Sequence, residues 1–182
     1  MVSAAFPDSF YLEADDRSSG IRVERPAHGL SVGMRAEVTG TVKTNADGER
    51  YVEALWATKN GTGWVDPLGM NRKLLGGADF LFNGSTGAGQ QGVLDGFGLN
   101  NIGLLVRLWG RVTEVEPASP PTWFTLDDGT GPGVKCVIPS DVTISPAWQL
   151  ISVTGISSCE KVAEELHRLL RVRQQADIVP VQ

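Results

Sequence analysis

Two pairs of neighbouring aspartates have the residue type and spacing that first suggest chemistry. Asp15-Asp16 and Asp127-Asp128 each lie in a polar, glycine-containing stretch between two apolar runs. Paired carboxylates can bind a metal ion or act as a general acid and base. However, neighbouring residues in a hairpin turn point apart, and neither pair has a histidine close by in the sequence. Side chains that accept hydrogen bonds from turn amides therefore explain both pairs better.

The remaining residues of catalytic type are sparse. His28 lies beside Gly29 in an expected loop, His167 lies in an expected helix, and neither neighbours a nucleophile. The sequence contains no nucleophile-elbow, phosphate-loop or zinc-protease motif. We therefore expect no catalytic residues, no metal site and no cofactor.

The two cysteines, Cys136 and Cys159, form no CxxC pair and have no histidine at ligand spacing, which argues against zinc. A disulfide between them and two buried free thiols are both compatible with the sequence.

Aromatic and basic residues of the expected strands are the candidates for ligand binding, because bases and sugars stack on exposed aromatic rings. If the two Asp pairs are aligned, Tyr11 matches Trp123 and Leu12 matches Phe124. Neighbours in a strand face opposite ways, so this alignment places Leu12 and Phe124 in the core and Tyr11 and Trp123 on the outer face. For each residue the alternative is a core aromatic or a solvated arginine. The candidates are Tyr11, Arg22, Arg35, Tyr51, Trp109, Arg111, Trp123 and Lys135.

The elements that must position these residues occur twice. FYLEADDRSSGIRV (residues 10–23) and TWFTLDDGTGPGVKCV (residues 122–137) share an aromatic-led strand, an acidic turn and a returning strand. A Val-Thr-Gly follows each copy, at residues 38–40 and 153–155. The pattern indicates one supersecondary unit used twice.

Each unit is expected to contain a hairpin, a long strand and a last strand. Gly40 and Gly110 lie inside long alternating strands, where glycine predicts a bend or bulge. Val2–Ala5 is typical of the end of a strand whose first part would precede Met1, so the first unit lacks most of one strand. Whether Met1 is a natural start stays open. The expected strands are 10–14, 21–24, 35–44 and 50–56 in the first unit and 104–115, 123–126, 134–138, 148–156 and 170–178 in the second.

One helix is expected near the C-terminus. Ser157 and Glu160 have the spacing of a capping box. Val162, Leu166 and Leu169 then share one helical face. These signals predict a helix over about residues 158–169.

The sequence therefore predicts a mainly β protein: two OB-fold-like, five-stranded Greek-key barrels with one C-terminal helix. The 22 glycines and 10 prolines suit short strands joined by turns. The expected divisions are 1–56 for the first barrel, 57–103 for an ordered glycine-rich connector and 104–182 for the second barrel. The connector holds 12 of the 22 glycines but also many apolar residues, which a disordered linker would not carry.

The two hairpin segments, with VGMRAEVTGTV and LLVRLWGRVTEVE, resemble the domains of bacterial tandem OB-fold proteins. Such domains are described as nucleic-acid-binding or as modules of unknown function in large secreted or surface proteins. The DDGTG turn at residues 127–131 also resembles that of OB-folds in aminoacyl-tRNA synthetases and helicases. The resemblance implies a fold and an extracytoplasmic or cell-surface location, with a cytoplasmic location as the alternative.

Three functions are compatible with these features. The first is a non-catalytic interaction module of a larger extracytoplasmic protein, with a protein or glycan partner. The second is single-stranded nucleic-acid binding, which a net charge of −5 disfavours because phosphate binding needs a basic surface. The third is a self-assembling structural subunit in which a neighbouring copy fills the open barrel edge. No membrane span or signal peptide is expected.

Overall fold

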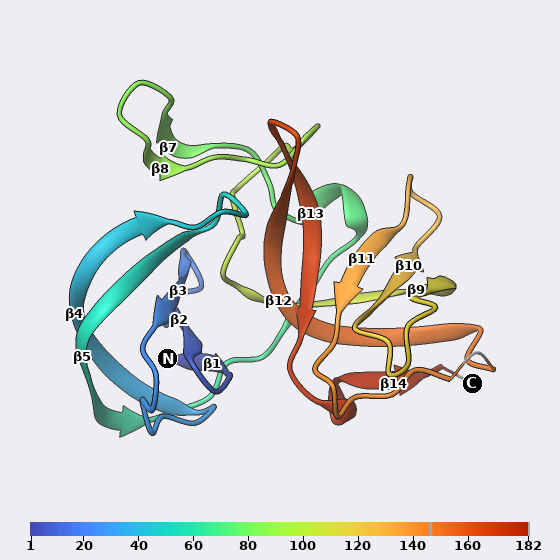
Figure 1. The fold of residues 1–182 in the computed structure, drawn as a ribbon, viewed down its shortest axis with the longest axis horizontal. Helices are drawn as coiled ribbons and strands as arrows, with labels where there is room; N and C mark the ends of the chain where they lie inside the picture. Colours follow the sequence, from blue (N-terminus) through green and yellow to red (C-terminus); the bar gives the residue numbers. More distant parts are fainter. Residues whose placement is uncertain (146, 182) are drawn as a thin grey trace.

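The computed structural model describes residues 1–145 and 147–181, which fold into β-strands joined by turns and two short 3₁₀ helices. Figure 1 shows two sheet-built halves side by side, with the β7–β8 hairpin projecting from the connector. The expectation of a mainly β protein is confirmed. The described residues contain no α-helix, and so none that is long and apolar enough to cross a membrane.

The N-terminal sheet has the strand order β1-β2-β3-β5-β4. Strands β3 and β5 pair in parallel, and the other neighbours are antiparallel. Its strands are β1 (Val2–Ala5), β2 (Ser9–Glu13), β3 (Gly20–Glu24), β4 (Met34–Thr44) and β5 (Arg50–Thr62).

The C-terminal sheet contains the same order, β9-β10-β11-β13-β12, and closes on itself because β12 also pairs with β9. Strands β11 and β13 pair in parallel, as β3 and β5 do. Two short strands, β6 and β14, extend this sheet. The bounds are β6 (Leu68–Gly69), β9 (Leu105–Val115), β10 (Trp123–Asp127), β11 (Val134–Val137), β12 (Leu150–Val162), β13 (Glu165–Val172) and β14 (Ile178–Pro180).

Strand register gives a residue-by-residue equivalence between the halves. Phe10 pairs with Val23, which pairs with Val52. Phe124 pairs with Cys136, which pairs with Leu170. Ala54, two residues after Val52, pairs with Gly40. Val172, two residues after Leu170, pairs with Gly155. The two Val-Thr-Gly segments therefore occupy equivalent places.

Both of these glycines lie where the long strand passes close over the last strand. A Cβ on Gly40 would lie 2.2 Å from the carbonyl oxygen of Glu53, and one on Gly155 would lie 2.6 Å from that of Arg171. Glu53 and Arg171 are themselves equivalent by register. The bulge expected at Gly40 is confirmed, since the register shifts between Thr39 and Gly40.

The expected helix over residues 158–169 is wrong. This segment is the end of β12 and most of β13, which turn at Ala163, a residue with φ +55°. Ser157 and Ser158 cap no helix but are fully buried, with hydroxyls that bond side chains of other segments. The strands are covered on both faces, so the alternation that marks a half-exposed strand is lost. The last expected strand, 170–178, likewise divides between β13 and β14, with the 3₁₀ helix η2 (Gln175–Asp177) between them.

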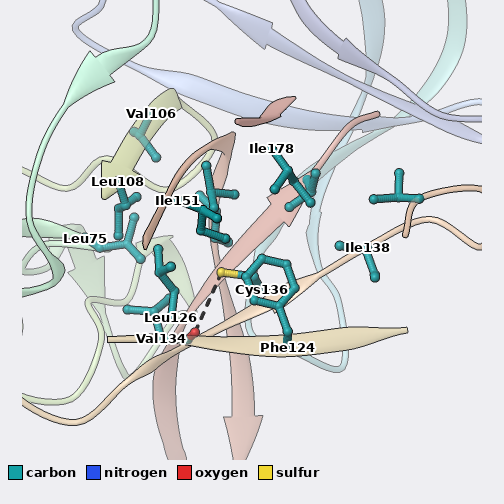
Figure 2. Close-up of a cluster of buried hydrophobic side chains, with 14 of the residues drawn as sticks. Leu75, Val106, Leu108, Phe124, Leu126, Val134, Cys136, Ile138, Ile151 and Ile178 are labelled. Carbon is teal, nitrogen blue, oxygen red and sulfur yellow. Dashed lines mark hydrogen bonds between the residues drawn. The ribbon is translucent and has the colours of Figure 1, made fainter. Parts of the chain in front are cut away.

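The C-terminal half contains the larger core. Figure 2 shows its buried side chains converging, most of them from strands of the closed sheet, with Cys136 among them. In the N-terminal half only four residues form the corresponding buried cluster: Val2, Phe10, Val23 and Leu30.

The connector is ordered and packs against both halves. Its main elements are η1 (Arg72–Leu74), β7 (Phe80–Asn83) and β8 (Ala88–Gln90), in addition to β6. Gln90 accepts a hydrogen bond from Arg50 N at 2.8 Å, and Asn101 accepts one from Ser157 Oγ at 2.7 Å. Strand β5 continues to Thr62, so the connector begins later than residue 57.

Candidate functional site

The candidate site is a strand position that is filled in the C-terminal half and empty in the N-terminal half. In the C-terminal half, Leu105–Arg111 of β9 pairs antiparallel with Leu150–Ile156 of β12. By the equivalence of Gly155 with Gly40, the matching segment of β4 is Arg35–Thr41. We call its unpaired side the open edge.

The short strand β1 replaces only the last part of β9. Ala5 pairs with Phe10 as Val115 pairs with Phe124, and Val2 pairs with Leu12 as Val112 pairs with Leu126. Both pairings carry a register shift at the same place. Met1 is therefore equivalent to Arg111, and none of the described residues takes the place of Leu105–Gly110.

Because no described strand fills this place, β4 is the edge strand of its sheet. Among the described residues it pairs only with β5. The nearest backbone bond to β1 comes from Gly33, just before the strand, whose N donates to the carbonyl oxygen of Val2 at 3.0 Å. The backbone groups along Arg35–Thr41 are thus available to a further strand.

A cavity of about 520 Å³ lies on the concave side of this edge. Its apolar wall comes from β2, β3, β4 and the connector, and includes Leu12, Ile21, Ala36, Val42, Phe80 and Ile102. In the C-terminal half, Val106 and Leu108 of β9 are buried in the core instead. The missing strand segment thus explains both the free edge and the unfilled interior beside it.

A buried carboxylate, Glu49, forms the polar end of the cavity. Tyr11 Oη donates to its two oxygens at 3.0 and 3.2 Å, and Ser158 Oγ donates to Oε2 at 3.1 Å. Arg171 Nε lies 4.0 Å from Oε2. Burial raises the pKa of Glu49, and the positive charge of Arg171 opposes part of that increase. The cluster joins the two halves, because Ser158 and Arg171 belong to the C-terminal sheet.

A second buried carboxylate, Glu13, joins the halves beside the cavity. Its Oε1 accepts a hydrogen bond from Leu105 N at 2.6 Å, and Arg17 Nε lies 3.4 Å from Oε2. Arg17 also donates to the carbonyl oxygen of Leu105 at 3.1 Å. Burial raises the pKa of Glu13 as well. These contacts hold the start of β9 against the N-terminal sheet.

The expected outward placement of Tyr11 is wrong, because its side chain is fully buried between the halves. The Asp alignment differs from the strand register, which matches Leu12 with Leu126, by two residues and so leaves Tyr11 on the same face. The error arises because the C-terminal half covers this face, where Tyr11 packs with Leu105 and Ile156. Phe124 is buried as expected.

The other candidate binding residues do not gather at one site. Arg22 lines the cavity, Arg35 forms an ion pair with Asp15, and Tyr51 is half-buried on β5. Trp109 and Arg111 are exposed on β9. In the C-terminal sheet Lys135 Nζ lies 5.8 Å from the ring of Trp123 and 2.7 Å from Glu160 Oε2.

Three of the residues of catalytic type make local hydrogen bonds. Asp16 and Asp127 accept hydrogen bonds from the turn amides of Ser18 at 3.0 Å and Gly129 at 2.8 Å. The ring of His28 bonds the backbone of Phe6 and Leu30.

The cysteines are free and buried, so the disulfide that the sequence left open is not formed. Burial raises the pKa of both thiols, those of Cys136 and Cys159. In the described part of the chain, no cluster of histidine, cysteine and acidic residues has the arrangement of a metal site.

Sequence analysis predicted the strand at Val2–Ala5, but it missed the buried pair Glu13 and Glu49. No local signal distinguishes a carboxylate that another half of the molecule will cover. Comparison with protein-family models, curated proteins and solved structures found no match.

Proposed function

We propose that each half is an OB-fold barrel, complete in the C-terminal half and incomplete in the N-terminal half. The order first-second-third-fifth-fourth, with a parallel third–fifth pair, supports the assignment in both sheets. The return of β12 to β9 supports closure of the second barrel. The equivalent glycines Gly40 and Gly155 support a duplication.

We propose further that the protein is a non-catalytic interaction module that binds an extended polypeptide segment along the open edge. The observation that carries this proposal is the unpaired Arg35–Thr41 edge beside the cavity, at the place that β9 fills in the other half. A peptide that adds a strand gains backbone hydrogen bonds from the edge and side-chain contacts from the pocket. Its resemblance to tandem OB-fold modules favours a setting within a larger extracytoplasmic protein.

Self-assembly is the second candidate, because a neighbouring copy can supply the missing strand to the same edge. Nucleic-acid binding is less well supported, since the cavity wall is largely apolar and the net charge is −5.

The test uses a peptide with the sequence of residues 105–111, labelled and joined to a soluble neutral tail. We expect saturable binding by fluorescence anisotropy, and no binding by a peptide of the same composition in which apolar and polar residues are exchanged along the strand. Absence of binding by the first peptide at about 1 mM, where the binding free energy would be only about −4 kcal/mol, would overturn the proposal.

Two matched variants locate the binding. Ala36→Phe places a ring in the cavity and is expected to weaken peptide binding at least about tenfold, equivalent to about 1.4 kcal/mol. Thr41→Phe, on the opposite face of the same strand, is expected to retain binding. Equal effects of both variants would place the peptide elsewhere. Light scattering of the free protein tests self-assembly, which predicts oligomers that the peptide dissociates.

A further inference from the structure

The C-terminal half shows how an occupant of the open edge is recognised on the outer face. There Arg107 Nε of β9 donates to Thr154 Oγ1 of β12 at 2.9 Å. Thr154 is the middle residue of the second Val-Thr-Gly, so its equivalent is Thr39 on the open edge. The hydroxyl of Thr39 is exposed, and no strand covers this side of β4 in the described residues.

A carboxylate lies next to this hydroxyl on the same face. Glu37 precedes Thr39 by two residues, is exposed, and forms no ion pair within the described chain. The other charged side chains of β4 are both paired: Arg35 with Asp15, and Lys43 with Glu53 at 2.6 Å. Glu37 is therefore the uncompensated charge of the open edge.

The inner face has the opposite character. Ala36 on β4 occupies the position that Ile151, fully buried, holds on β12, so the open edge presents a smaller side chain to the interior. The adjoining cavity of about 520 Å³ falls within the range of about 300–1,000 Å³ typical of ligand pockets. Large apolar side chains of an added strand have room there.

Building on the proposed function, we infer that the bound segment is basic on its outward face and apolar on its inward face. It is a polypeptide segment other than the described residues, at least seven residues long by comparison with Leu105–Arg111, and runs antiparallel to β4. A lysine or arginine lies opposite Thr39, where Glu37 and Thr39 receive it. Glu37 and Thr39 are thus specificity-determining residues, while the cavity accepts alternate apolar side chains.

The experiment varies the charge of the peptide and the charge of the protein. Three peptides carry the sequence of residues 105–111 unchanged, with Arg107→Gln, or with Arg107→Glu. Each is titrated by fluorescence anisotropy into the full chain, into Glu37→Lys and into Glu164→Lys. The last is the matched control, since Glu164 is exposed on the β12–β13 turn and gives the same change in net charge.

We expect the unchanged peptide to bind the full chain about fivefold more tightly than the Arg107→Glu peptide at low salt, as for an exposed ion pair. Glu37→Lys is expected to reverse this order, and Glu164→Lys to preserve it. The preference is expected to shrink at high salt because the pair is exposed to solvent.

The outcomes separate the two proposals. If all three peptides bind the full chain equally, the charge selection is wrong while strand binding stands. If Glu37→Lys and Glu164→Lys act alike, Glu37 has no specific role and this inference fails. If no peptide binds and sedimentation shows a dimer that Ala36→Phe disrupts, a second copy occupies the open edge, and both proposals are wrong.

Discussion

The two halves of the molecule share one strand order and differ in one segment. In the C-terminal half Leu105–Arg111 closes the sheet and contributes to a core of fifteen buried residues. In the N-terminal half the equivalent segment is absent from the described chain, and the sheet has a free edge and a cavity. The comparison teaches that the hairpin and long strand have the same arrangement in both halves, although no described residue closes the N-terminal sheet.

The open half is held in shape by contacts with its neighbour. Glu13 and Glu49 bond backbone or side chains of the C-terminal half, and Tyr11 is buried between the two. Buried polar groups of this kind must be satisfied to avoid a large cost, so they fix one relative arrangement of the halves.

The largest effect is expected when apolar side chains are shortened in both interiors, which tests whether only the C-terminal interior is fully packed. Leu108→Ala is expected to lower the free energy of unfolding by about 2–5 kcal/mol, because it leaves a hole in a packed core. Val42→Ala, at the half-exposed cavity wall, is expected to change it by less than about 0.5 kcal/mol. Urea unfolding measures both. Equal losses would show that the two interiors are filled alike.

A second prediction tests the equivalence of the glycines. Gly40→Ala and Gly155→Ala are each expected to lower the free energy of unfolding by about 1–3 kcal/mol, since the new methyl group meets a backbone carbonyl. Gly129→Ala is a control with open space around the site but a positive φ of +77°. A large loss at only one of Gly40 and Gly155 would argue against equivalent strand crossings.

The third prediction concerns pH. Burial raises the pKa of Glu49 above its ordinary value of 4.5, so the folded protein holds this proton more tightly than the unfolded chain. Stability is therefore expected to fall as pH rises above 4.5, by about 1.4 kcal/mol per pH unit between the two pKa values.

Glu49→Gln removes this contribution, so the variant is expected to gain stability relative to the parent protein as pH rises. Thermal unfolding between pH 4 and 8 measures the difference, with the exposed Glu164→Gln as control. A constant difference across this range would mean that Glu49 titrates as it does in the unfolded chain. Glu13 contributes in the same direction and leaves a smaller slope in the variant.

A modest gain in stability is expected from filling the open interior. Ala36→Ile introduces at β4 the residue type that β12 has at Ile151, and the cavity has room for it. We expect the free energy of unfolding to rise by up to about 1 kcal/mol through added apolar burial, measured by urea unfolding. A loss of more than 1 kcal/mol would indicate that the wall is already packed.

Much of the fold was predictable from local patterns. The hairpins around the Asp turns, the long strand β4 with Gly40 at its bulge, the ordered connector and the strand at Val2–Ala5 all have short-range signals. Asp, Ser and Gly set turns through their own backbone bonds, and period-2 alternation marks a strand with one wet face.

The errors lie where one half covers the other. Ser158 and Leu169 pair on neighbouring strands, and both are buried. Because both faces of these strands are covered, residues 158–169 do not alternate between apolar and polar side chains, and the sequence predicts a helix there. Tyr11 was placed in solvent for the same reason, and the candidate binding residues proved to be scattered over both sheets.

The amino-acid sequence by itself determined the repeated strand plan, because turn residues and alternation act over a few neighbours. Only the tertiary structure decided which faces are buried, where Glu49 loses its solvent and which edge stays free. Those properties depend on segments far apart in the chain, whose contacts leave no local pattern.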